Sequence, residues 1–188
     1  MQTLRFLALV AIAGAAAGPV TAQVSVGAAG VYASLNGTDF NATDAGFGLD
    51  AQVRFPLGAT ASIGFGGQRT SHGLRGALNN VAVTGVFAEP RLTLQTAASV
   101  KAYLLARGGY LHESYSEPGF DAKANGYYVG GGAGLLIAAR PRVAVDLSIL
   151  FGSVSFGEAT INGSKVSNSN VNGTAIVLRA GILFGLGK

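Results

Sequence analysis

Residues 143–151 read Val-Ala-Val-Asp-Leu-Ser-Ile-Leu-Phe, and this stretch decides the fold. All of its odd-numbered positions are apolar, whereas its even-numbered positions include Asp146 and Ser148. Because successive side chains of a β-strand point to opposite faces, the alternation predicts a strand with one apolar and one mixed face. Residues 47–55 and 176–184 show the same period of two. The chain is therefore expected to be all-β.

Working outward from this stretch, the pattern predicts eight strands. Their approximate ranges are 23–35, 45–55, 59–70, 81–95, 100–113, 126–138, 143–156 and 172–185. Strands of globular proteins average about 5–6 residues, whereas a tilted strand that crosses a bilayer needs about 9–11. The lengths of the predicted strands thus favour a membrane barrel.

The connections between these strands alternate in length. The short ones are 56–58, 95–99 and 139–142, and the longer, polar ones are 36–44, 71–80, 114–125 and 157–171. Outer-membrane barrels have short turns inside and long loops outside, whereas nothing in water forces a soluble lipocalin-type barrel, the alternative, to segregate its connections. Because hydrocarbon requires every backbone group to be paired, the sheet must close. We predict a closed antiparallel up-and-down transmembrane β-barrel of eight strands.

The first 22 residues have the layout of a secretory signal peptide. Arg5 supplies a positive start, residues 6–17 are a short apolar stretch, and Val20-Thr21-Ala22 places small side chains before the expected cleavage point. An apolar stretch of about a dozen residues is too short to cross a bilayer as a helix. The predicted organisation is a cleaved signal peptide at 1–22 and an outer-membrane β-barrel domain at 23–188.

Composition argues against several kinds of site and partner. Charged residues make up only 12% of the chain and cysteine is absent, which removes disulfides and thiolate metal sites. The net charge of +4 is spread without a run of Lys and Arg, so nucleic acid is not an expected partner. With two histidines in the chain, no cluster of three or four metal ligands is visible. We expect neither a metal nor a cofactor.

Strand parity assigns eight charged side chains to the lumen of the barrel. An Arg or Lys on the lipid face at mid-depth would cost about 2–4 kcal/mol, so the apolar faces are set outward. The lumen charges are then Asp50, Arg54, Glu89, Arg91, Lys101, Arg107, Asp146 and Arg179. Because side chains just fill an eight-stranded lumen, these charges are expected to pair and to plug it. The alternative is unpaired charges that line a water-filled pore.

The turn around residues 97–98 supports one specific ion pair. Strands that leave such a turn place Glu89 opposite Arg107 within one residue. Asp146 and Arg179 lie at similar depth on the last two strands, but their long loop fixes the register less well. Glu89–Arg107 is the pair that the register best supports.

Taken together, the signal peptide, the eight alternating strands, the glycine-rich faces and the long polar loops resemble the small outer-membrane barrels of the outer-membrane protein A and opacity-protein type. The resemblance is architectural and covers nearly the whole of 23–188. It implies a location in the cell outer membrane, contact with outer-membrane lipid and lipopolysaccharide, and use of the export and barrel-insertion machinery. The implied role is structural, with an extracellular ligand at the long loops.

Two other functions stay open at this stage. One is a narrow porin-like channel for ions or small solutes. The other is a rim-located lipid-modifying enzyme, in which His112 and Ser114 share a strand face and Glu117 orients the imidazole. Because a rim histidine beside a polar loop needs no catalytic explanation, we expect no enzymatic activity.

Overall fold

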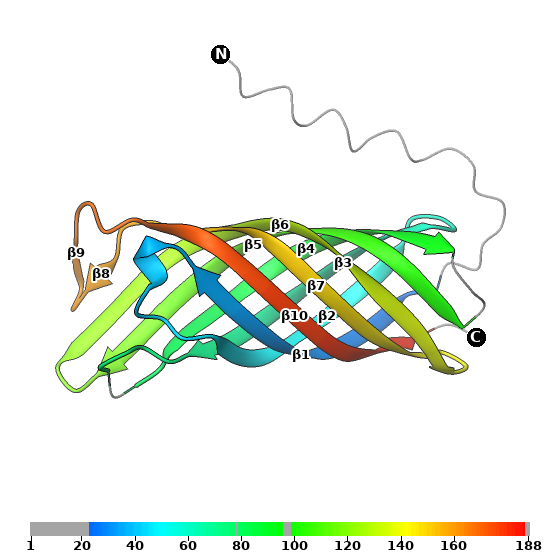
Figure 1. Ribbon diagram of the computed structural model, residues 1–188, viewed down its shortest axis with the longest axis horizontal. Helices are drawn as coiled ribbons and strands as arrows, with labels where there is room; N and C mark the ends of the chain where they lie inside the picture. The colour runs from blue at the N-terminus through cyan, green and yellow to red at the C-terminus, as the bar shows by residue number, and fades with distance from the viewer. Residues whose placement is uncertain (1–22, 78, 96–98, 187–188) are drawn as a thin grey trace, which may run out of the picture.

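The computed structural model describes residues 23–77, 79–95 and 99–186, so the predicted signal peptide lies outside the described residues. Eight strands form a ring: β1 (Ser25–Asn36), β2 (Gly46–Pro56), β3 (Ala61–His72), β4 (Val81–Gln95), β5 (Val100–Glu117), β6 (Phe120–Arg140), β7 (Val143–Phe156) and β10 (Val171–Gly185). Neighbouring strands are antiparallel, β1 pairs with β10, and the β5–β6 pairing closes the ring. The predicted eight-stranded barrel is confirmed (Figure 1). Among the described residues, no helix is both long and apolar enough to span a membrane.

The two ends of the barrel differ. At the turn end, β10 finishes beside the start of β1, and short connections link β2 to β3 and β6 to β7. At the loop end, the connections are longer and carry three small elements: the 3₁₀ turn η1 (Thr38–Phe40), β8 (Thr160–Ile161) and β9 (Ser164–Lys165). In Figure 1 the loop end lies on the left.

The outer wall is apolar, as the strand parity predicts. Side chains such as Leu49, Phe65 and Leu178 are 70%, 50% and 44% exposed. Large aromatic side chains mark the border of this wall toward the loop end, and we call them the aromatic belt: Tyr32, Phe47, Tyr110, Tyr127 and Phe151. Such rings favour the boundary between hydrocarbon and headgroups. The wall therefore has the surface that a bilayer requires, not the surface of a soluble barrel.

The predicted loop at 114–125 is wrong. β5 and β6 stay paired as far as Glu117 and Phe120, and Gly119 at the turn has φ of 82°, a value that favours glycine. Beyond the membrane both faces of a hairpin meet water, so the apolar alternation that signals a strand disappears although the backbone pairing continues. The ends of the other strands agree with the prediction within two residues.

A second small hairpin lies against this one. β8 pairs with β6 through Ile161 and Thr160, and β9 pairs with β8 around the Asn162–Gly163 turn. Both turn residues have positive φ, 49° and 83°, as a two-residue Asn-Gly hairpin turn requires. We call residues 113–125 together with β8 and β9 the hairpin extension. It projects beyond the ring at the loop end (Figure 1).

Candidate functional site

Glu89, at the centre of the lumen, is inaccessible to solvent and contacts four arginines. Arg54 and Arg91 donate hydrogen bonds to its Oε1 at 2.6 and 2.8 Å. Arg107 and Arg179 donate to its Oε2 at 2.8 and 3.2 Å. These arginines come from β2, β4, β5 and β10, so a single carboxylate links strands from around the ring.

Strand register explains why Glu89 meets Arg107. On one side of this position Ala88 pairs with Gly108, and on the other Arg91 pairs with Leu105. The same register continued between these pairs places Glu89 opposite Arg107. Both side chains point inward because both positions have inward parity.

Two aspartates complete the interior charge network. Asp50 accepts hydrogen bonds from Arg179 at 3.1 Å and Arg107 at 3.4 Å. Asp146 accepts from Arg91 at 2.8 Å and from the Tyr103 hydroxyl. Asp146 therefore pairs across the lumen with β4 and β5, and not with Arg179. In the β7–β10 ladder, Arg179 lies opposite Ser148, two residues from Asp146.

Lys101 lies apart from the other seven predicted lumen charges, which corrects its assignment to this group. Lys101 is the second residue of β5, and its side chain is exposed near the turn end. At the barrel mouth water solvates its ammonium group, so no buried carboxylate is needed there. The buried network is thus Asp50, Arg54, Glu89, Arg91, Arg107, Asp146 and Arg179.

The network holds four arginines and three carboxylates, which leaves one net positive charge. Neutral acceptors take up part of the excess: Arg54 donates to Gln52 at 2.8 Å, and Arg107 donates to Gln68 at 3.1 Å. Arg107 also lies over the ring of Phe87 at 3.7 Å from its centroid, where the negative face of the ring attracts the cation. These contacts offset the missing fourth carboxylate.

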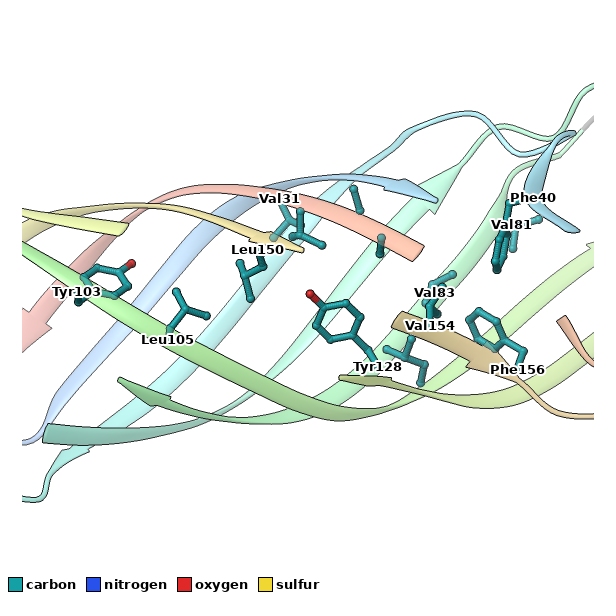
Figure 2. Packing of buried hydrophobic residues seen from close by; sticks show 14 residues of the cluster. Val31, Phe40, Val81, Val83, Tyr103, Leu105, Tyr128, Leu150, Val154 and Phe156 are labelled. Atoms are coloured by element: carbon teal, nitrogen blue, oxygen red, sulfur yellow. The ribbon is translucent and has the colours of Figure 1, made fainter. Parts of the chain in front are cut away.

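Between the charge network and the loop end, apolar side chains pack the lumen along the barrel axis (Figure 2). Leu150 and Phe156 are 0% and 1% exposed. Phe40, from η1, packs edge-on against Phe156 with 6.4 Å between the ring centroids. The cavity that these side chains line together with Thr70, His72 and Arg107 has a volume of about 30 Å³.

Sequence reasoning missed this apolar column because it sent apolar residues outward. In residues 149–151 consecutive side chains are all apolar, so polarity alone does not say which one faces in. The position along the strand does say it, because Leu150 lies an even number of residues from Asp146 and Ser148 and therefore faces the lumen with them. The available signal was therefore the position of Leu150 relative to a charge on the same strand.

The candidate catalytic residues at the rim do not converge. His112 and Ser114 face outward, and a ring nitrogen of His112 lies 2.8 Å from the Asn125 side-chain oxygen. Glu117 has the opposite parity on β5 and is hydrogen-bonded to Tyr115. Over the described ranges, no three His, Asp or Glu side chains are grouped as a metal site would require.

Comparison with known proteins finds solved structures that share this fold. No protein-family model and no curated protein sequence matches the chain. Neisserial surface protein A matches in structure with a TM-score of 0.66 and 19% identity, over 88% of this chain and 97% of that one. The outer membrane protein OprG from Pseudomonas aeruginosa gives 0.57 and 12%, over 92% and 97%.

A third solved structure adds a ligand to the comparison. Ail, the attachment invasion locus protein of Yersinia pestis, was solved in complex with the heparin analogue sucrose octasulfate. It matches with a TM-score of 0.50 and 16% identity, over 87% of this chain and 97% of that one. At such identities the likeness concerns the fold, and it confirms the resemblance to small outer-membrane β-barrels.

Proposed function

We propose that this chain is an integral outer-membrane β-barrel protein that serves as a closed scaffold for its extracellular loops and hairpin extension. The observation that carries the proposal is the burial of Glu89 and Leu150, one in the lower and one in the upper part of the lumen. An ion moving along the axis would have to displace Glu89 and Leu150, both inaccessible to solvent. Opening the lower part would separate buried ion pairs, and opening the upper part would break apolar packing. The closed form is therefore the stable one.

The outer wall supports residence in a membrane. Its side chains are apolar between the turn end and the aromatic belt, and such a surface in water would invite aggregation. With the loop end outside the cell, the barrel contacts outer-membrane lipid and lipopolysaccharide along its wall. It would reach that site through the export and barrel-insertion machinery. We expect a non-catalytic role, since the rim residues His112, Ser114 and Glu117 do not converge.

The loops and the hairpin extension are the parts placed to meet an extracellular ligand. Their charged residues are Asp39, Asp44, Arg75, Glu113, Glu117, Asp121, Lys123, Glu158 and Lys165. The acidic members outnumber the basic ones, so this surface favours a neutral or cationic ligand. The sulfated heparin analogue bound by Ail is strongly anionic, and we therefore expect a different ligand chemistry here.

Single-channel recording in planar bilayers tests the closed scaffold. The protein, extracted from outer membranes in detergent, is expected to insert without discrete openings. Glu89→Ala alone should stay silent, because Leu150 still fills the upper lumen. Glu89→Ala combined with Leu150→Ala should produce openings, whereas the exposed Glu158→Gln should stay silent. Stable openings of the unmodified protein would refute the proposal and identify a narrow porin-like channel instead.

A further inference from the structure

Polar side chains form a stripe across four neighbouring strands, from the outer wall at the aromatic belt onto the base of the hairpin extension. In the ladders Arg69 lies opposite Thr84, Thr84 opposite His112, and His112 opposite Asn125. One step closer to the loop end, Ser71, Ser114 and Lys123 face the same way on β3, β5 and β6. Same-face neighbours of adjacent strands have Cβ atoms about 4.5–5.5 Å apart. We call these residues the polar stripe: Arg69, Ser71, Thr84, His112, Ser114, Lys123 and Asn125.

Arg69 is the charged member of the stripe that makes no ion pair with another described residue. It is exposed on the outward face of β3, and its cross-strand neighbour Leu49 lies two residues from Phe47 of the belt. In the described part of the chain, the ion pairs outside the lumen are Arg75–Asp44 and Lys123–Asp121, and neither includes Arg69. A lipid-facing arginine costs little near the interface, where its long side chain reaches the headgroups.

The charge of the stripe is specific to this side of the barrel. On the far side, the outward residues next to the belt are neutral: Ser155 lies opposite Asn172, and Thr174 lies opposite Ser153 and Asn36. The loops above carry more acidic than basic residues, so they do not account for cations on the wall. The stripe therefore combines cations with hydroxyl and amide groups on one face.

We propose that the polar stripe binds the phosphate of a phosphorylated glycolipid headgroup in the outer leaflet, of the lipid A type. The guanidinium of Arg69 fits a phosphate through two parallel N–H groups, and the hydroxyls of Ser71 and Thr84 add donors beside it. Lys123 contributes less, because Asp121 lies 2.7 Å from its ammonium group. The site rests on the proposed function, since this headgroup lies against the wall only when the barrel sits in the outer membrane.

Binding of purified lipid A to the detergent-extracted protein, followed by native mass spectrometry, tests the site. Arg69→Gln should weaken binding about tenfold or more, and Arg69→Lys should weaken it less. Arg75→Gln is the matched control, because Arg75 is exposed but lies outside the stripe, and it should bind as the unmodified protein does. A heat-dependent gel shift verifies that each variant is folded.

Two further ligands show whether binding depends on the phosphate or on the rest of the lipid. Lipid A stripped of its phosphates should bind the unmodified protein as weakly as intact lipid A binds Arg69→Gln. Inorganic phosphate alone should bind far more weakly than the lipid. Equal binding of the stripped lipid, equal binding of inorganic phosphate, or unchanged binding by Arg69→Gln would overturn the site. Cell fractionation distinguishes this failure from failure of the proposed function, in which the protein is absent from the outer membrane.

Discussion

Glu89→Gln is the substitution that most directly tests the interior charge network. The side chain keeps its shape but loses the charge that accepts hydrogen bonds from four arginines. The net charge of the network rises from one to two positive charges, and the new amide N–H groups face other donors. Removing one partner of a buried ion pair costs about 3–5 kcal/mol. Because Glu89 serves four cations, we expect a loss of unfolding free energy toward the upper end of this range.

Urea unfolding in lipid vesicles measures this loss. The chain has no tryptophan, so circular dichroism and the heat-dependent gel shift report folding. Asp50→Asn should lower the unfolding free energy less than Glu89→Gln does, because Asp50 pairs with two of the four arginines, Arg107 and Arg179. Glu158→Gln, exposed in a loop, should change the unfolding free energy by about 0.5 kcal/mol or less. A smaller loss for Glu89→Gln than for Asp50→Asn would refute the central position of Glu89.

Other substitutions and a digestion test the packing and the topology. Leu150→Ala should lower the unfolding free energy by about 2–5 kcal/mol, because it opens a cavity in the apolar column; a loss below 1 kcal/mol would contradict tight packing there. Gly134→Ala should be destabilising, since the added methyl group would collide with the Tyr103 ring, whereas Gly108→Ala meets no atom within 4 Å and should be tolerated in the same urea assay. Trypsin added to intact cells should cleave after Lys165 in β9, and protection of this site would place the loop end inside.

The strands and their faces were predictable because a bilayer imposes strict rules. Lipid forces apolar side chains to one face of each strand, and a two-residue period records that face in the sequence. Close to a short connection the register is also readable, which is why Glu89 and Arg107 were expected to face each other. Across the long loop between β7 and β10 that information is lost, and the partner of Asp146 proved to be Arg91.

The rest of the candidate site lacked a sequence signal for physical reasons. Along β7 in the upper lumen the inward residues are as apolar as the outward ones, so Leu150 and Phe156 carried no mark of burial in the lumen. In the hairpin extension water bathes both faces, and the pairing of residues 114–117 with 120–123 leaves no periodicity to read. The outward direction of Arg69 was set by its parity on β3, but only the ladders showed which side chains lie beside it.

The long β5–β6 hairpin also determines how far the protein reaches from the cell. From Tyr110 of the aromatic belt to the tip at Glu117, a strand rising about 3.3 Å per residue extends roughly 23 Å. The hairpin is stiff, because its two strands keep a continuous register from Tyr110–Tyr127 to Glu117–Phe120. An epitope inserted between Pro118 and Gly119 would be held clear of the headgroup sugars and within reach of an antibody, which makes this turn a natural position for surface display.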